Sequence, residues 1–255
     1  MDTNDDTNRP IKTSQTVFGI IETINQYGSV TLSELAEVHE KAPSTIHDHL
    51  STLESLEYIV REGNQYRLSL RFLDLGMESR DRINLVKTAQ PILRQLADET
   101  GEVAWLYMEE YGYAVVLDHA RGDRAVRVIG RIGSRKPMHI TSSGKAILAY
   151  LPEKRVEEII QARGLSEASD RGISELSKLY SELEAVRDRG YAFNDEEEVR
   201  GLRAVGAPII TDGSVQGALS VSGPSNRMRR PRFDETIPEL LMAAVNEVEL
   251  KLTYD

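Results

Sequence analysis

The stretch that most constrains this chain runs over residues 31–68, because almost every residue type in it fits one local geometry. Thr31 and Glu34 have the spacing of a capping box, so a short helix is expected to start here. Pro43 occupies a position where the first residue of a second helix tolerates a missing N–H. The apolar residues of that second helix recur with the helical period and are Ile46, Leu50, Leu53 and Leu56. Two β-rich runs around a turn at residues 62–64 complete the pattern of a winged helix-turn-helix.

The polar side chains of the second helix are expected to point away from this core. Short hydroxyl and imidazole groups on the first turns of an exposed helix suit a DNA major groove, where they can reach phosphates and base edges. Basic residues lie on the preceding turn and on the hairpin, or wing. The candidate DNA contacts are Lys41, Ser44, Thr45, His47, Asp48, Arg61 and Arg67. The alternative is a small helical subdomain used only for protein contact, since this geometry is also a way of packing short helices.

The composition bounds the class of protein. The chain has 255 residues, enough for a small domain and a larger one, and 40% of them are hydrophobic. No apolar run approaches the length of a membrane span, and the first ten residues lack the features of a secretory signal. The absence of cysteine excludes disulfides and thiolate metal sites and fits a reducing compartment. We therefore expect a cytoplasmic protein with no membrane partner.

The charge balance is unusual for a DNA-binding protein. The net charge is −10, and residues 1–75 contain 12 acidic and 6 basic residues, a net of −6. One explanation is local clustering of basic residues near the DNA; these are Lys41, Arg61, Arg67 and Arg71. The other is adaptation to high internal salt, where counterion release drives little binding. Only 8 of the 31 basic residues are lysine, which favours the second explanation, although a GC-rich genome would also favour arginine.

The chain is predicted to be an α+β protein. Its expected parts are a disordered tail (residues 1–12), the winged helix (13–70), a charged linker helix (71–89) and a larger domain (90–255). In the larger domain a helix is expected from Pro91 and another from Asp234 onward. Strands are expected over residues 103–108, 113–119, 125–130, 205–210 and 215–222. Two batches of strands with helices between them predict a largely antiparallel sheet flanked by helices.

The most informative polar stretch of the larger domain is HITSSGKA, residues 139–146, because hydroxyls and Gly at a helix start expose N–H groups towards an anion. It is not a phosphate loop, which needs Gly and a hydroxyl residue where this chain has His139 and Ala146. Taken alone, an ordinary capped helix start is an equally good interpretation. The acidic run at residues 195–198 is interpreted mainly as a solvated loop. The arginines at 227, 229, 230 and 232 are interpreted as a surface loop, with contact to DNA phosphates or to acidic neighbours as the alternatives. The histidines have no metal spacing and no catalytic triad stands out, so no catalytic residue, metal or cofactor is expected.

Four blocks of sequence carry a family resemblance. They are KPMHITSSGKAILA (136–149), GYAFNDEE (190–197), GLRAVGAPI (201–209) and GALSVSGP (217–224). In this order behind a winged helix, they resemble the IclR family of transcriptional regulators over nearly the whole chain. The resemblance implies a homodimer or dimer of dimers that binds operator DNA. It also implies a sensor domain similar to the GAF fold, which binds a small metabolite, often a carboxylate or another product of carbon catabolism.

The resemblance also implies a set of effector contacts. Carried over residue by residue, these are the backbone N–H groups of Ser142 and Ser143 together with Asn194, Ala204, Ser220 and Ser222. Asn194 stands where the family usually has Asp, Ala204 where Cys is frequent, and Asp48 where Arg is common in the recognition helix. Asn offers a donor and an acceptor without charge, so the ligand need not be the usual one. A structural dimerisation protein would fill the pocket with larger side chains. The expected function is therefore a ligand-responsive DNA-binding regulator; the alternative is a metabolite-binding signalling module or enzyme whose helix-turn-helix serves only assembly.

Overall fold

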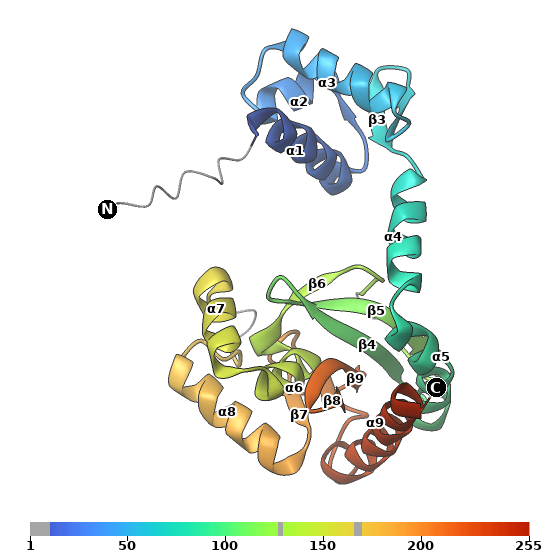
Figure 1. Ribbon diagram of the computed structural model, residues 1–255, viewed down its shortest axis with the longest axis vertical. Coiled ribbons are helices and arrows are strands. Elements are labelled where there is room, and N and C mark those ends of the chain that lie inside the picture. Colours follow the sequence, from blue (N-terminus) through green and yellow to red (C-terminus); the bar gives the residue numbers. More distant parts are fainter. Residues whose placement is uncertain (1–10, 127–129, 166–169, 255) are drawn as a thin grey trace. The chain divides into compact units, whose positions relative to one another are not determined.

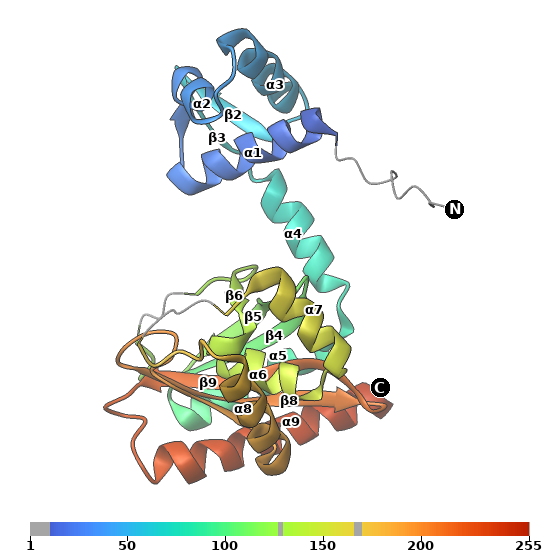
Figure 2. The same ribbon diagram turned by 90° about the vertical axis from the view of Figure 1, so that its left-hand side faces the viewer.

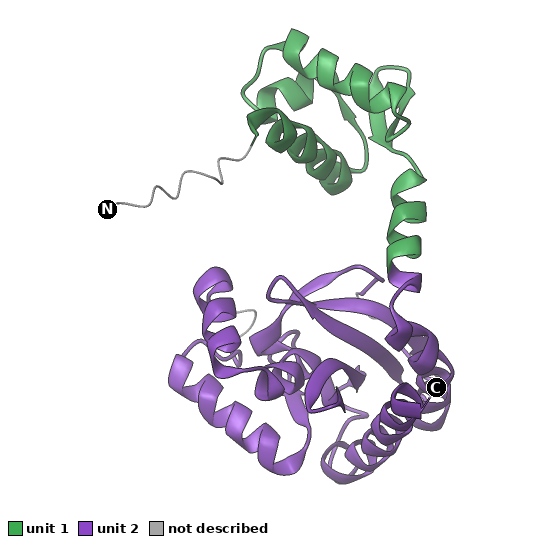
Figure 3. Ribbon diagram, in the orientation of Figure 1, with its two compact units in different colours: residues 1–79 green, residues 80–255 purple. Residues whose placement is uncertain are grey.

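The chain divides into two compact units, residues 1–79 and residues 80–255 (Figure 3). The computed structural model describes residues 11–126, 130–165 and 170–254. Each unit contains its own hydrophobic core, and each is described here by itself. Of the tail expected to be disordered, residues 1–10 lie outside the described residues, and Lys12 already begins a helix.

Unit 1 is a winged helix-turn-helix, as the sequence predicts. Its helices are α1 (Lys12–Tyr27), α2 (Leu32–Val38) and α3 (Pro43–Ser55) (Figure 1). Its strands are β1 (Val30–Thr31), β2 (Ile59–Glu62) and β3 (Gln65–Leu68), in the sheet order β1-β3-β2. The capping box forms at the start of α2, where the Thr31 N–H donates to Glu34 Oε2 at 2.7 Å and the Glu34 N–H donates to Thr31 Oγ1 at 3.3 Å. The side chains of Ile20, Leu35 and Ile46 are fully buried between the helices. The apolar period of the sequence is therefore the buried face of the helices.

Two details of unit 1 differ from the expectation. Leu56 is 53% exposed rather than buried, because α3 ends at Ser55 and Leu56 is the first residue after it. The strand β1 was not expected, since two residues give no periodicity, yet Val30 pairs with Tyr66 of the wing. This pairing ties the segment before α2 to the hairpin.

The helix expected over residues 71–89 is two helices. α4 (Arg71–Asp81) ends before Arg82, and α5 (Asn84–Thr100) begins well before Pro91, where the sequence predicted a helix start. Pro91 lies inside α5, where it removes one backbone hydrogen bond. No apolar residue of α4 is fully buried, whereas α5 buries a full apolar face. The change in burial explains why the sequence of α4 is rich in charge.

Unit 2 is built on one antiparallel sheet of six strands in the order β6-β5-β4-β9-β8-β7. The strands are β4 (Val103–Glu110), β5 (Tyr113–Arg121), β6 (Arg135–Pro137), β7 (Ala192–Asp195), β8 (Leu202–Thr211) and β9 (Ser214–Pro224). The central strands are 8 to 11 residues long, whereas the outer strands β6 and β7 have 3 and 4 residues. The pairing of β4 with β5 contains a bulge, since Leu106 lies opposite Asp118 and Tyr107 opposite Val116.

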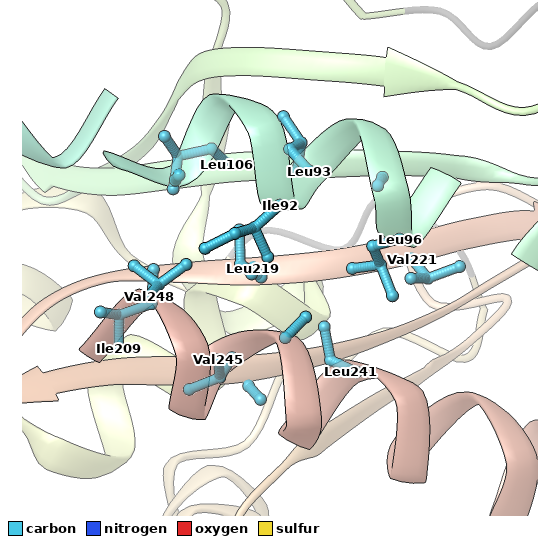
Figure 4. Packing of buried hydrophobic residues seen from close by; sticks show 14 of the residues in the cluster. Ile92, Leu93, Leu96, Leu106, Ile209, Leu219, Val221, Leu241, Val245 and Val248 are labelled. Atoms are coloured by element: carbon cyan, nitrogen blue, oxygen red, sulfur yellow. The ribbon is translucent and has the colours of Figure 1, made fainter. Parts of the chain in front are cut away.

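Helices cover both faces of this sheet. On one face lie α5 and α9 (Ile237–Tyr254), whose apolar side chains interdigitate with those of the central strands (Figure 4). On the other face lie α6 (Ser142–Tyr150), α7 (Glu153–Arg163) and α8 (Leu176–Arg189) (Figure 2). Alternate residues of each strand therefore enter two different cores.

The strand expected over residues 125–130 is wrong at its described ends, since Ala125, Val126 and Gly130 have no strand structure; residues 127–129 lie outside the described residues. The arginine-rich segment before α9 is more structural than the expected surface loop. Arg227 donates from Nε to Glu102 Oε1 at 2.9 Å and from Nη2 to Glu102 Oε2 at 2.5 Å, and Glu102 is fully buried. A buried carboxylate requires such a partner, so Arg227 stabilises the fold.

Candidate functional sites

The exposed face of α3 contains the residues predicted to contact DNA. Ile46 and Leu50 face the core, which leaves the other side of the helix to solvent. The predicted residues on and just before α3 are all exposed: Lys41, Ser44, Thr45, His47 and Asp48. His47 Nδ1 lies 3.6 Å from Asp48 Oδ1. This face is polar and free of bulky apolar groups.

The wing holds its two arginines by contacts that the sequence did not reveal. Arg67 donates from Nε to Glu62 Oε1 at 2.7 Å, across the hairpin. Arg61 donates from Nε to the carbonyl of Gly63 at 3.0 Å, and its guanidinium lies 5.7 Å from the centre of the Tyr66 ring. Glu62 therefore offsets the charge of Arg67 at the tip of the wing.

Unit 2 contains a cavity of about 180 Å³ on the α6 face of the sheet. All six residues predicted to contact an effector line it: Ser142, Ser143, Asn194, Ala204, Ser220 and Ser222. The rest of the cavity wall is formed by residues that were not predicted to contact an effector: Trp105, Tyr107, Val126, Gly130, Lys136, Thr141, Glu198, Val199 and Leu202. The cavity thus has hydroxyl groups on one part of its wall and aromatic or aliphatic groups on others.

The register of the strands brings the small residues together. Asn194 pairs with Ala204, and Ala204 pairs with Ser222 on the next strand. Two residues along, Gly206 pairs with Ser220, which in turn pairs with Trp105 of β4. Because alternate residues share a face, these two rows form the sheet wall of the cavity. Small side chains there leave the volume that larger ones would fill.

The start of α6 closes the cavity opposite the sheet. The Thr141 hydroxyl accepts a hydrogen bond from the Gly144 N–H at 3.0 Å, which caps the helix. Among the described residues, no acceptor is found for the N–H groups of Ser142 and Ser143, the first two residues of α6. A Cβ added to Gly206 would lie 2.6 Å from Ser143 N, so the glycine in the middle of β8 is required for this close approach. Ser142 and Ser143 both line the cavity, so this helix start forms part of the cavity wall.

Asn194 is held by the backbone at both ends of its amide. Nδ2 donates to the carbonyl of Ile140 at 2.9 Å, and Oδ1 accepts from the Glu197 N–H at 3.0 Å. Asn194 is 1% exposed. A ligand can therefore reach only the second amide hydrogen and the second lone pair. The main effect of this side chain is to join the segment before α6 to the turn after β7.

The acidic run at residues 195–198 is not the solvated loop that the sequence suggested. Glu197 accepts from Lys145 Nζ at 2.6 and 2.7 Å, Glu198 lies 2.8 Å from Lys136 Nζ, and Asp195 accepts from Arg203. Lys145 is 1% exposed. Burial raises the pKa of the Glu197 carboxyl, while the Lys145 ammonium opposes that shift. Four carboxylates in a row gave no sign of which would be buried, because their partners are distant in the sequence.

Trp105 and Tyr107 form the aromatic part of the cavity wall. Trp105 donates from Nε1 to Ser222 Oγ at 2.8 Å. Burial, and then the nearby Glu198 carboxylate, raises the pKa of Tyr107 well above its ordinary value, so the phenol stays protonated. The sequence signal for these residues was weak: both are alternate aromatic residues in a strand, a pattern equally typical of an ordinary core.

Among the described residues, no three His, Asp or Glu side chains converge as metal ligands. In the same part of the chain, no helix is long and apolar enough to span a membrane.

Comparison with known proteins assigns the family. The model of the bacterial transcriptional regulator IclR C-terminal domain matches residues 77–248. The chain belongs to the IclR family of transcriptional regulators. It is 33% identical over 238 residues to the probable HTH-type transcriptional regulator ArcR of Halobacterium salinarum, covering 91% of this chain and 90% of that protein.

Solved structures of the IclR family match the whole architecture. IclR of Thermotoga maritima matches with a TM-score of 0.78 and 28% identity, covering 95% of this chain and 99% of that one. An IclR homolog from Microbacterium hydrocarbonoxydans, complexed with 4-hydroxybenzoate, matches with a TM-score of 0.81, covering 95% and 100%; at 22% identity this is a likeness of fold. Membership of the IclR family makes this chain a DNA-binding transcriptional regulator and not an enzyme.

Proposed function

We propose that the cavity of unit 2 binds a small polar metabolite, a carboxylate or a sugar-derived acid from carbon catabolism, and that this binding changes the affinity of the winged helix for operator DNA. The observation that carries the proposal is that Ser142 and Ser143, whose N–H groups have no acceptor among the described residues, line the cavity. A helix start presents unsatisfied donors and the positive end of a dipole, so a carboxylate is stabilised there without a buried arginine.

The rest of the cavity suits the same class of ligand. The hydroxyl groups of Ser220 and Ser222 provide hydrogen bonds for a hydroxyl or carbonyl group, and Trp105 and Leu202 pack against the carbon skeleton. The volume of about 180 Å³ equals that of roughly six waters in the liquid. The cavity is therefore of the size of a small organic acid.

For DNA binding we propose that α3 enters the major groove and that the wing lies along the phosphates. The support is the exposed polar face of Ser44, Thr45 and His47 and the basic groups of Arg61 and Arg67 beside it. Lys41 would meet the backbone at the helix start, and Asp48 could accept from a cytosine amine. We further propose that the chain works in the cytoplasm as a homodimer or a dimer of dimers, which would match a two-fold symmetric operator.

Calorimetric titration of the full chain tests the cavity. The probes are pyruvate, gluconate and 4-hydroxybenzoate, the last because a structural neighbour is complexed with it. We expect Ser142→Ala to have a mild effect, because the backbone N–H remains, and Ser143→Pro to lower the affinity severely, because proline removes that N–H. A true effector must also change operator affinity in a gel shift, and operator DNA must change effector affinity by the same factor. The proposal would be refuted by a ligand whose affinity is unchanged in Ser143→Pro, or by a ligand that binds without changing operator affinity.

A further inference from the structure

The last turn of the linker helix α4 is fixed to the edge of the effector domain by one arginine. Arg80 donates from Nε to the carbonyl of Leu117 at 2.7 Å and from Nη2 to Asp118 Oδ2 at 2.6 Å. Both charged side chains are about nine-tenths buried, at 11% and 10% exposure. Gln90 of α5 donates to the same carboxylate oxygen at 3.3 Å. We call Arg80, Leu117 and Asp118 the Arg80 clamp.

The clamp depends on the bulge in β5. Leu117 is the extra residue between the pairs Leu106–Asp118 and Tyr107–Val116. A bulge leaves one residue out of the ladder and re-aims the side chains that follow it. Here it frees the Leu117 carbonyl for Arg80 and turns Asp118 to the α5 face, while His119 returns to the cavity face. In a regular strand Asp118 and His119 would lie on the opposite faces.

His119 connects this segment to the cavity. Its ring stacks on Trp105 with centroids 5.1 Å apart and an angle of 29° between the planes. His119 Nδ1 is buried and has no hydrogen-bond partner among the described residues, so the stack orients the ring. Trp105 in turn is oriented by its hydrogen bond to Ser222, on the cavity wall. The backbone N–H of His119 donates to Asp118 Oδ1 at 2.8 Å, which joins the stack to the Arg80 clamp.

We propose that the Trp105–His119 stack and the bulged segment of β5 couple occupancy of the cavity to the Arg80 clamp, and through it to the linker helix. The proposal rests on the proposed function of the cavity. A ligand hydroxyl that donates a hydrogen bond to Ser222 Oγ competes with Trp105 Nε1 for that acceptor. The indole then shifts, His119 moves with it because the two rings are stacked, and the contacts of the Asp118 carboxylate with Arg80 change. Conversely, a change in the contacts of Arg80 with Leu117 and Asp118 alters the surroundings of Trp105.

Trp105 is the only tryptophan of the chain, so its fluorescence reports on the coupling without any effector. The first experiment adds to the ligand-free protein an operator fragment found by genomic footprinting. We expect a change in Trp105 emission that a non-operator fragment of equal length and composition does not produce. The change should be lost in Arg80→Gln and in His119→Ala, whereas His119→Phe, which keeps a stacked ring, should retain it. Arg155→Gln is the matched control, because it removes an ion pair with Glu109 of the same sheet, at 2.8 Å, away from this route.

The second experiment measures coupling with whichever of pyruvate, gluconate or 4-hydroxybenzoate binds. In the parent we expect the ligand to change operator affinity by about tenfold, and in Arg80→Gln and His119→Ala by less than about twofold, with the ligand still bound. If Arg80→Gln does not fold, the pair His119→Ala and His119→Phe decides alone.

The outcomes separate the two proposals. Operator binding without a change in Trp105 emission overturns the coupling route, as does coupling that survives His119→Ala or is lost equally in Arg155→Gln. Failure of all three probes to bind overturns the proposed ligand class, while the operator experiment still decides whether β5 transmits the signal.

Discussion

The ion pair of Lys145 and Glu197 provides a sharp test of what holds the effector domain together. Lys145 is 1% exposed and its Nζ lies 2.6 Å from Glu197 Oε1 and 3.7 Å from Glu182 Oε1. The change Lys145→Met keeps the length and the apolar stem of the side chain and removes only the ammonium group. Two carboxylates then lie close together inside the protein without the charge between them.

The geometry sets the size of the effect. Two unit charges 2.6 Å apart attract by about 6 kcal/mol at an effective dielectric constant of about 20. Part of this is offset by the cost of removing both ions from water, and removing one member of a buried pair typically costs about 3–5 kcal/mol. For a domain of this size that corresponds to a drop in Tm of about 6–20 °C.

Urea unfolding followed by Trp105 fluorescence measures the loss, because this tryptophan reports on unit 2. Lys178→Met is the matched control: Lys178 lies at the same 2.6 Å from Glu175, but the two side chains are 65% and 59% exposed. Solvent screening should hold that loss below about 1 kcal/mol. Equal losses in the two variants would contradict the argument that burial makes the Lys145 pair strong.

The pH dependence of Lys145→Met follows from the raised pKa of Glu197. A carboxyl whose folded-state pKa is raised binds its proton more tightly in the folded protein. The contribution of this carboxyl to the free energy of unfolding is most favourable below its ordinary pKa of about 4.3, and it is lost as the pH rises through the raised folded-state pKa. Removing Lys145 removes the opposing charge and raises that pKa further.

Acidification from about pH 8 to about pH 5 should therefore recover part of the lost stability in Lys145→Met, relative to Lys178→Met. The double change Lys145→Met with Glu197→Gln should abolish the recovery. Recovery that persists in the double variant would show that a different group titrates.

Three other predictions concern the two binding surfaces. Asn194→Asp replaces the donor to the Ile140 carbonyl by an oxygen, so we expect urea unfolding to show a stability loss of about 1–3 kcal/mol; unchanged stability would contradict the bridging role of the amide. In calorimetry, relative to the parent, the substitution should weaken the binding of gluconate more than that of neutral glucose. Gly206→Ala should displace the start of α6 and lower the affinity for carboxylate probes by at least about tenfold, since a Cβ 2.6 Å from the Ser143 N forces that backbone to shift; an unaltered affinity would mean that Ser143 N does not bind the ligand. Changing Ser44 and Thr45 together to Glu should abolish the operator gel shift while light scattering shows the parent's oligomer, and a gel shift equal to the parent's would refute docking through α3.

The sequence predicted those parts of the fold in which the signal is local. The capping box at Thr31, the helical period of α3 and the Gly-containing turn of the wing each depend on residues within a few positions of one another. The cavity residues came instead from the resemblance to a family, and the structure brings all six of them to one cavity.

What could not be predicted depends on contacts between distant residues. Lys145 and Glu197 are 52 positions apart, and nothing in either segment shows that both are buried. The bulge at Leu117 depends on the pairing of two strands, so the side on which Asp118 and His119 lie could not be read from alternation alone. The end of α3 before Leu56 shows the remaining difficulty, since the apolar period continued one position past the helix.

The two outer strands of the effector-domain sheet also bear on how copies of the chain can associate. β6 has three residues and β7 has four, so each offers only a few free backbone groups to a neighbouring molecule. The charges of Arg135 and Lys136 on β6 are paired with those of Glu110 and Glu198. Edge strands as short as β6 and β7 disfavour extension of the sheet from one molecule into the next, which protects the domain from open-ended polymerisation.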